Sequence, residues 1–422
     1  MKERRGDENI MAFVMAGGAG ARLRPLTDMR SKPAVPFGAR YRIVDFVLSN
    51  LVNSRIYTIY LLVQYKSQSL IEHVRKAWQF GAVLPGHFVT VVPPQMLTDA
   101  GWFQGTADAV YQNIALIKRH RPELVAVFGA DHIYRMDVRQ MVRHHHERRA
   151  DVTIAARPVP IRLGAEFGTI AADAECRVTG FFEKSAEPPE MGTYPGHALA
   201  SMGNYLFETD VLIEALEAAH RRGEADFGRD ILPRLLQDRV VVAYDFSANE
   251  IPGLKHYEHP AYWRDVGTIE TYFSAHQDML GQQPRFDEFN PQWPIYSSNY
   301  QGPVARIDSG ELENCLLGAA SVVNGARLRN CILRREVVVE PDAELHNCIL
   351  MDYVRIERGA RLKNVIVDRH RAIRAGTRIG YDAENDRRSF HVTPTGIVVV
   401  PKGEISYYAR DTRKSGRSGY EE

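Results

Sequence analysis

One short pattern returns four times in the last third of the chain and limits the fold more than any other feature of the sequence. It consists of a leucine, a polar residue, an asparagine, a cysteine or valine and two aliphatic residues. Its copies begin at Leu312, Leu328, Leu345 and Leu362, in steps of 16, 17 and 17 residues. A repeat this short, with aliphatic positions about six residues apart, is typical of one coil of a parallel β-helix. We therefore predict a β-helix of hexapeptide-like coils; the left-handed form is expected, although the spacing itself leaves the handedness open.

Three of the four cysteines occupy the same place in successive repeats. Because stacked coils place like residues above one another, Cys315, Cys331 and Cys348 should form one buried row. No two cysteines form a C-x-x-C pair, and four in 422 residues make no disulfide framework. We interpret the row as small buried hydrophobic side chains and not as a metal or redox site.

The chain before the repeats has a different rhythm. Short apolar runs of strand length alternate with helical patterns up to about residue 285, and on one such helix Leu70, Val74 and Trp78 would share a face. The runs are residues 12–16, 59–63, 125–128 and 152–156. Such alternation favours an α/β sheet of Rossmann-like type with helices on both faces. Ligands of such sheets bind beyond the carboxyl ends of the strands.

A segment rich in proline and aromatic residues separates the alternating strands and helices from the repeats. We predict an α/β domain over residues 1–285, an ordered connector over 286–305, the β-helix over 306–400 and a polar, frayed tail over 401–422.

Charge and hydropathy exclude several classes of protein. The 53 Lys and Arg residues nearly balance the 52 Asp and Glu residues, so no net field draws the chain to nucleic acid or an anionic membrane. The chain contains no run of 18 apolar residues, which is the length needed to span a bilayer. Residues 1–10 lack the apolar segment of a signal peptide. We expect a cytoplasmic enzyme without a nucleic-acid or membrane partner.

A glycine-rich loop follows the first apolar run. Gly17, Gly18 and Gly20 would let backbone N–H groups approach a phosphate closely, and Arg22 and Lys32 lie just beyond them. The spacing matches neither the dinucleotide fingerprint nor the Walker loop. The two cations nevertheless favour a polyphosphate ligand.

An acidic residue follows another apolar run. Asp131 comes shortly after residues 125–128, where a carboxylate is well placed to hold an oxygen-ligated metal. The histidines at 144–146 are less suited to metal, because consecutive helical positions point about 100° apart whereas paired ligands need a spacing of four. We interpret them as a solvated helix end.

Several collinear motifs resemble a known family. The glycine-rich loop followed by Lys32-Pro33 resembles the signature of sugar-1-phosphate nucleotidyltransferases. Five further segments resemble the ADP-glucose pyrophosphorylases in particular, namely residues 31–50, 102–110, 131–134, 200–203 and 263–267. The resemblance runs in order from about residue 11 to about residue 400 and includes the repeats.

The resemblance implies a reaction and a set of site residues. ATP and glucose 1-phosphate would give ADP-glucose and pyrophosphate, for glycogen or another α-glucan. Arg22, Lys32 and Asp131 would be catalytic, and Asp131 and Asp265 would hold Mg²⁺. The nucleotide-binding residues would be Ala16, Gly17, Gly18, Gly20, Gly105, Thr106, Ala107 and Asp108. The glucose 1-phosphate site would comprise Gly168, Glu183, Lys184, Ser201, Asp226, Phe227 and Trp263.

The resemblance also implies assembly and regulation. It suggests a homotetramer that responds to small metabolite effectors, with Arg30 and Arg42 as candidate anion contacts. Met29, Pro36 and Phe103 depart from residues common in relatives, so the effectors cannot be inferred from the sequence.

Three alternatives remain open at this stage. A nucleotidyltransferase specific for UTP or dTTP is disfavoured by residues 105–108, which resemble the ADP-glucose branch. A non-catalytic regulatory subunit would lack phosphate-binding cations or metal carboxylates, yet Arg22, Lys32, Asp131, Lys184 and Asp265 are all present. A fused hexapeptide-repeat acyltransferase would need more coils than the four clear repeats.

Overall fold

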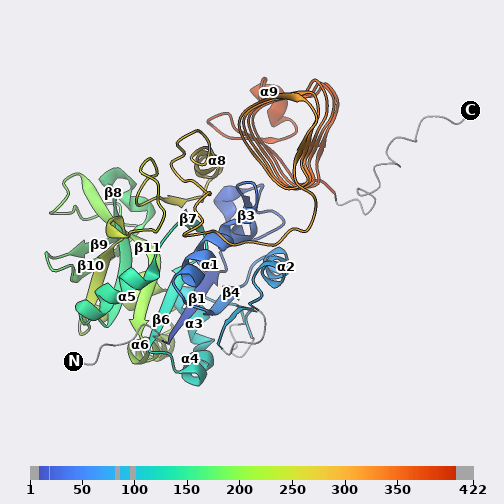
Figure 1. The fold of residues 1–422 in the computed structure, drawn as a ribbon. Coiled ribbons are helices and arrows are strands. Elements are labelled where there is room, and N and C mark those ends of the chain that lie inside the picture. Colours follow the sequence, from blue (N-terminus) through green and yellow to red (C-terminus); the bar gives the residue numbers. More distant parts are fainter. Residues whose placement is uncertain (1–8, 19, 81–85, 96–100, 405–422) are drawn as a thin grey trace, which may run out of the picture.

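The chain folds into an α/β part and a stack of flat coils beside it (Figure 1). The structure is a computed structural model that describes residues 9–18, 20–80, 86–95 and 101–404. The predicted polar tail therefore lies almost wholly outside the described residues. The last helix of the α/β part, α8 (Ile269–Gln277), is followed by a long segment without helix or strand that leads to the first strand of the coils at Arg306.

A twisted sheet forms the centre of the α/β part. Its middle strand, β1 (Ile10–Ala16), pairs in parallel with β4 (Thr58–Val63) and β6 (Leu124–Gly129). Within the described residues the sheet has nine strands, and its main path runs β10, β9, β11, β6, β1, β4, β5. The other strands are β5 (Phe88–Val92), β8 (Val152–Pro160), β9 (Gly168–Ala172), β10 (Val178–Glu183), β11 (His197–Glu208) and β12 (Val241–Asp245).

Helices cover both faces of this sheet, as the alternation of apolar runs predicts. Ala12 and Val14 of β1 point into one buried cluster and Met11 and Phe13 into another, so the central strand is apolar on both sides. Helices α1 (Ile43–Asn53), α2 (Gln68–Ala77) and α5 (Val138–Glu147) pack into the first cluster. Helices α3 (Thr106–Tyr111), α4 (Ile114–His120), α6 (Thr209–Arg222) and α7 (Leu232–Leu235) pack into the second. In the described part of the chain, no helix combines the length and the hydrophobicity needed to cross a bilayer.

The repeats form the predicted parallel β-helix. The four copies of the repeat fall on β15 (Gly310–Leu317), β17 (Ala326–Leu333), β19 (Glu344–Leu350) and β21 (Arg361–Val367), which pair in register. A second face is built from β14 (Arg306–Ile307), β16 (Val322–Val323), β18 (Val338–Val339), β20 (Arg355–Ile356) and β22 (Ala372–Ile373). The sequence indicated four coils, and the structure adds a fifth. It consists of β23 (Arg378–Ile379) and β25 (Val398–Val400), which both pair with β21 but are separated by α9 (Ala383–Arg387) and β24 (His391–Val392).

The asparagine of each repeat explains why the pattern is so regular. Asn314, Asn330, Asn347 and Asn364 all have positive φ, between 52° and 56°, and therefore turn the corner of each coil. The side-chain amides of the first three each donate to the amide oxygen of the asparagine in the next coil, at 2.7, 3.1 and 2.9 Å. The row thus satisfies the polar groups at the corner while it fixes the stacking.

The cysteines lie in one row beside this ladder, as predicted, but not all are buried. Cys331 and Cys348 are buried, whereas Cys315 is only half-buried. Cys315 lies opposite Cys331 on β15, which pairs with β17 on one side and has no pairing partner among the described residues on the other. The outermost coil therefore leaves its cysteine partly uncovered.

The β-helix is joined to the α/β part by a shared core and by buried ion pairs. Ile349 and Val399 of the coils pack in one cluster with Phe37, Phe46 and Tyr272. Arg334 donates to the carbonyl oxygens of Phe37, Gly38 and Tyr41 at 3.0, 2.9 and 2.8 Å, and to Asp352 at 3.0 Å. Arg30 donates to both carboxylate oxygens of Asp368 at 2.8 and 2.6 Å.

The connector is packed against the α/β part. Trp293 and Ile295 are buried, and Ser297 donates a hydrogen bond to Asp45 of α1 at 2.7 Å. Asp45 is fully buried and also accepts hydrogen bonds from His73 and Trp78 of the α2 region. Buried side chains and a hydrogen bond thus attach this segment to the α/β part.

The histidine-rich end of α5 is not simply solvated, so that prediction is wrong for its middle residue. His145 is fully buried, and its Nδ1 lies 2.8 Å from the Thr153 hydroxyl of β8. The helical repeat turns this position toward the sheet, while His144 and His146 are half-buried. Because the three histidines are adjacent and polar, the sequence did not show that His145 lies on the apolar face of the helix.

The burial of His145 predicts a loss of stability in acid. Burial, assisted by the neighbouring His146, lowers the pKa of His145 from 6.5 to about 4. The unfolded chain takes up this proton below about pH 6.5, whereas the folded chain does so only near pH 4. We expect His145 to contribute up to about 1.4 kcal/mol of destabilisation per pH unit as the pH falls through this window. Chemical denaturation of the His145→Gln variant between pH 7 and 4.5 should show a shallower slope, while His256→Gln, at an exposed position, should match the wild type.

Candidate active site

A deep cleft opens at the carboxyl ends of β1, β4 and β6. Its volume is about 750 Å³, and segments far apart in the sequence line it. Twelve of the residues predicted to act lie on its wall, namely Gly17, Gly18, Gly20, Arg22, Lys32, Gly105, Thr106, Asp131, Glu183, Lys184, Asp226 and Phe227. The structure therefore brings the predicted phosphate, nucleotide and sugar residues into one cavity.

The glycine-rich loop begins where β1 ends and needs glycine at one point in particular. Gly20 has φ of 61°, and a Cβ at that position would lie 3.1 Å from the Cβ of Lys32 and from Thr27. Arg22 follows in a single 3₁₀ turn, Ala21–Leu23, with its side chain 68 % exposed toward the cleft. The loop thus places open backbone and a mobile cation side by side at the end of the central strand.

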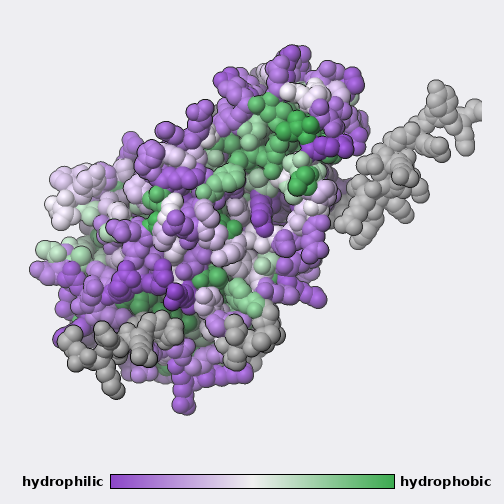
Figure 2. Space-filling view, in the orientation of Figure 1, coloured by the Kyte–Doolittle hydropathy of each residue, from purple (hydrophilic) through white to green (hydrophobic). Residues whose placement is uncertain are grey.

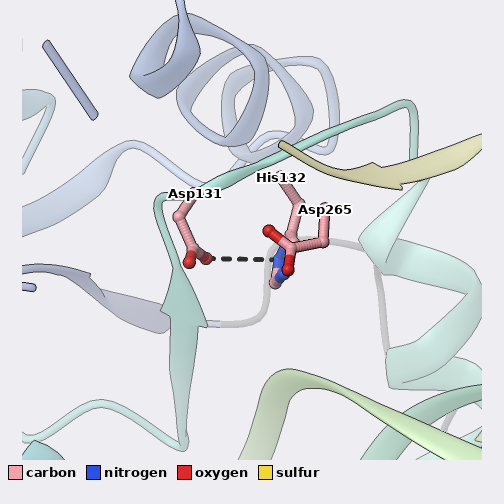
Figure 3. Close-up of side chains that lie close together, drawn as sticks. All are labelled: Asp131, His132 and Asp265. Carbon is pink, nitrogen blue, oxygen red and sulfur yellow. Dashed lines mark ion pairs between the residues drawn. The ribbon is translucent and has the colours of Figure 1, made fainter. Parts of the chain in front are cut away.

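Two carboxylates meet at the floor of the cleft because two short strands pair. Asp131 lies between β6 and β7 (His132–Tyr134), and β7 pairs in antiparallel fashion with β13 (Trp263–Asp265). This register sets Asp265 opposite His132. Figure 3 shows the three side chains turned toward one another, with the Nδ1 of His132 3.4 Å from a carboxylate oxygen of Asp131.

A buried lysine lies between these carboxylates. The Nζ of Lys32 is 2.8 Å from the Oδ1 of Asp265 and 3.1 Å from the Oδ2 of Asp131, and its side chain is only 9 % exposed. Burial alone would lower the pKa of Lys32, but the two carboxylates outweigh burial and raise the pKa. Burial alone would raise the pKa of Asp131, but His132 and Lys32 hold it well below its usual range. Both groups are therefore charged at neutral pH.

The same cluster has the donors of a divalent-cation site. One ligand atom from each of Asp131, His132 and Asp265 can be chosen so that all three lie within 4.8 Å of one another. Two carboxylates are the ligands that hard cations such as Mg²⁺ prefer, and an imidazole is compatible with several divalent ions. The residues present therefore fit a divalent metal. Sequence reasoning did not single out His132, although its place next to Asp131 was the available signal.

The opposite wall carries a carboxylate and an ammonium at the end of β10. The Oε1 of Glu183 lies 3.1 Å from the Nζ of Lys184, whose side chain is 66 % exposed. Cβ atoms built at Gly168 and Gly228 would lie 2.9 and 2.8 Å from the Oε2 of Glu183. Gly168 therefore acts by leaving room for Glu183, even though it does not line the cleft itself.

The loop before α3 is fastened to the segment that carries Asp226. The Thr106 hydroxyl donates to the carboxylate of Asp226 at 3.0 Å and accepts from the backbone N–H of Phe227 at 3.1 Å. A Cβ at Gly105 would lie 2.4 Å from the carbonyl oxygen of Ala225, so the two segments touch through backbone. Thr106 thereby couples the predicted nucleotide and sugar sides of the cleft.

Comparisons with known proteins agree with this geometry. The nucleotidyl transferase family matches residues 11–282, and a GlmU-like C-terminal hexapeptide family matches residues 304–400. A glucose-1-phosphate adenylyltransferase from Thermodesulfovibrio yellowstonii is 52 % identical over 93 % of this chain and 96 % of its own. Glucose-1-phosphate adenylyltransferases from Thermus thermophilus and Deinococcus radiodurans are 51 % and 45 % identical over 93 % and 94 % of this chain, and over 98 % and 99 % of their own.

The chain belongs to the glucose-1-phosphate adenylyltransferase family. These enzymes are the ADP-glucose pyrophosphorylases that the motifs resemble, so the resemblance is confirmed. The matches also confirm a nucleotidyltransferase domain followed by hexapeptide coils.

Some of the predicted site residues lie behind the wall of the cleft. The hydroxyl of Ser201 accepts a hydrogen bond at 3.2 Å from the backbone N–H of Gly203, which does line the cleft, at a bulge in β11. The ring of Trp263 packs against His132, with centroids 4.5 Å apart. Ala16 ends β1, and Ala107 and Asp108 use their backbone N–H groups on the carbonyl of Ala225. These residues hold the lining residues in place and do not themselves line the cleft.

Sequence reasoning also passed over residues that shape this cleft. The side-chain amide of Gln64 forms two hydrogen bonds with the backbone of Phe103. It accepts from the N–H at 2.6 Å and donates to the carbonyl at 3.2 Å. Tyr205 lines the cleft on its predicted sugar side, and burial raises its pKa. Neither belongs to a short motif, and only their places after or within a strand could have indicated them.

Proposed function

We propose that this protein transfers the adenylyl group of ATP to glucose 1-phosphate and releases pyrophosphate, forming ADP-glucose for glycogen or another α-glucan in the cytoplasm. A phosphate oxygen of the sugar attacks the α-phosphorus of ATP, and the bond to the β-phosphate oxygen breaks. The sugar phosphate is largely dianionic at neutral pH, since its second pKa is about 6. The reaction therefore needs cations and positioning more than a strong base.

The cluster of Lys32, Asp131 and Asp265 beside the glycine-rich loop carries this proposal. Arg22 and Lys32 line the cleft beside the glycine-rich loop, and their charges would stabilise the departing pyrophosphate. The nucleotide side would be formed by Ala16 to Gly20 and by residues 105–108. The sugar side would be formed by Glu183, Lys184 and Asp226, with the remaining predicted residues behind them.

Enzymes of this kind generally use a divalent metal, and we propose Mg²⁺. Asp131 and Asp265 would hold it, and when bound it would neutralise charge on the phosphates. Asp131 presents its carboxylate at the end of the strand, and Asp265 is brought to it by β13. The two residues belong to the α/β part, which we propose as the catalytic domain over residues 1–285, ahead of a connector and a β-helix over 306–400.

Pyrophosphate release tests the proposed function. Purified protein is incubated with glucose 1-phosphate and Mg²⁺, with ATP, UTP or dTTP in parallel. Release with ATP alone is expected. Release with UTP or dTTP instead would overturn the assignment of adenine as the nucleobase. No release even after addition of sugar phosphates and pyruvate would favour a regulatory subunit.

Replacement of Lys184 should separate the two substrates. Because the exposed ammonium of Lys184 stands beside Glu183 on the sugar side, Lys184→Ala should raise the KM for glucose 1-phosphate by about 10- to 100-fold and change that for ATP little. Initial rates with each substrate varied in turn measure both constants. A selective loss of ATP affinity would contradict the assignment of this wall to the sugar.

The site for metabolite effectors is proposed at the junction of the two domains. A pocket of about 530 Å³ there is lined by Arg40, Arg42, Arg334 and Arg335. Burial, together with Arg369 and other guanidinium groups, lowers the pKa of Arg42 to about 9, so an anion would relieve their repulsion. Arg30 is neutralised by the carboxylate of Asp368, whereas Arg42 donates its hydrogen bonds to uncharged oxygens of Ala34 and Ser69. Arg42 is therefore the stronger of the two predicted anion contacts.

The homotetramer is likewise proposed, and the β-helix supports it. Figure 2 shows hydrophobic residues gathered over the β-helix on one face. Val304 and Ile307 before and within the first coil are exposed, and β15 pairs on one side only among the described residues. A further copy of the chain would cover apolar surface and edge strands that are otherwise open.

A further inference from the structure

The arrangement of Lys32 between the two acidic residues has a consequence beyond the proposed catalysis, on which it rests. We propose that the Lys32 ammonium is an internal counter-ion that occupies the place of the divalent cation. It leaves Asp131 and Asp265 when these take up the metal, and only then extends toward the phosphates. Lys32 would thus set the metal affinity of the free protein as well as act on ATP.

The contacts show that Lys32 and a metal would compete for the same oxygens. The Nζ of Lys32 lies within 3.1 Å of one oxygen of Asp131 and one of Asp265. These carboxylates, with His132, are the group able to hold a metal among the described residues. An ammonium and a divalent ion repel each other strongly at such distances in a partly buried site, so the two cannot share it.

The surroundings allow the side chain to move while its backbone stays in place. Lys32 begins a 3₁₀ turn, Lys32–Ala34, whose carbonyl at Ala34 accepts a hydrogen bond from Arg42. Two residues earlier, Arg30 is fixed to Asp368 of the β-helix. The flexible stem of a lysine can nevertheless turn about its own bonds. Gly20, which leaves room beside the Cβ of Lys32, lies on the cleft side of this stem.

Arg22 does not fill the same role. Its guanidinium is 3.9 Å from Asp265, and its side chain is 68 % exposed, so solvent screens it. Lys184 offers another comparison, because it lines the same cleft but pairs with Glu183 and not with the metal carboxylates. These two cations therefore distinguish a specific counter-ion from a general effect of positive charge in the cleft.

Binding of Mn²⁺ to the full chain without nucleotide or sugar tests the proposal, with electron paramagnetic resonance reporting the free ion. Lys32→Met should bind Mn²⁺ about tenfold more tightly than the wild type, since the competing charge is removed. Lys32→Arg, which keeps the charge, and Lys184→Met, the matched control, should both stay within about threefold of the wild type. Adding Asp131→Asn to Lys32→Met should abolish the gain and so locate the bound ion.

Thermal unfolding gives a second measurement, and Lys32→Gln a second uncharged variant if Lys32→Met does not fold. Without its counter-ion, the variant should melt below the wild type in EDTA and gain more from added Mg²⁺. Mn²⁺ affinity of the uncharged variants that equals or falls below that of the wild type would overturn the proposal. An equal gain in Lys184→Met would do so too. Neither measurement uses turnover, so a failure of the proposed activity would be seen separately.

Discussion

Asp131→Asn should lower the rate of pyrophosphate release by roughly 10²- to 10⁴-fold. The change removes one of the two carboxylates that face each other at the floor of the cleft, while the amide keeps the size of the side chain. Because the Asp131 side chain is 42 % exposed, and Lys32 retains its shorter contact with Asp265, the fold should survive. Steady-state rates with ATP and glucose 1-phosphate, together with a melting curve, measure both effects.

A matched control lies on the far side of the same domain. Asp210 is an exposed residue in the first turn of α6, away from the residues that line the cleft. Asp210→Asn removes the same charge from the chain and should leave turnover as in the wild type. If Asp131→Asn kept more than about a tenth of the wild-type rate, Asp131 would have neither the metal nor the catalytic role proposed for it.

Arg334→Met should produce the largest loss of stability among single changes at the junction of the domains, about 3 kcal/mol or more. The guanidinium is 6 % exposed, and its loss would leave the carbonyls of Phe37, Gly38 and Tyr41 without this donor. Asp352 would lose one of its buried partners as well. Burial alone would raise the pKa of this carboxyl, but Arg334 and neighbouring arginines hold it at about 2. Urea denaturation and the melting temperature measure the effect.

Arg329 provides the comparison for this change. It lies on β17, the strand that ends one residue before Arg334, is 60 % exposed and pairs with Glu313 at 3.2 Å. Surface pairs of this kind contribute little, so Arg329→Met should cost less than about 0.5 kcal/mol. A cost below about 1 kcal/mol for Arg334→Met would contradict the role given to Arg334 and leave the junction to apolar packing and the Arg30–Asp368 pair.

The parts of the fold that were predictable are those that local sequence determines. The strands around 12–16 and 125–128 are apolar runs, and they set the glycine-rich loop and Asp131 at one edge of the sheet. The coils were predictable because every repeat carries the same asparagine corner and aliphatic positions. The repeat weakens after residue 379, where α9 interrupts the fifth coil. Only four clear repeats could therefore be counted, although the predicted β-helix extended to residue 400.

The parts that were not predictable depend on contacts between distant segments. The resemblance named Asp265, but only the pairing of β7 with β13 brings it beside Asp131. Nothing in the sequence near Arg30 indicates that Asp368 takes up its charge. His145 was misjudged because three adjacent histidines give no periodicity, although one of them faces the sheet.

Arg30 and Lys32 are separated by a single residue, yet one is anchored in the β-helix and the other lies between Asp131 and Asp265, the proposed metal ligands. Two residues of extended chain span at most about 7 Å, so whatever shifts the coils by a fraction of that length pulls on the lysine. The coils therefore anchor the segment that carries Lys32, and so help to set the position of its ammonium group. A chain that ended after the α/β part would lack this anchor. We therefore expect the α/β part and the β-helix to have been retained or lost together during evolution.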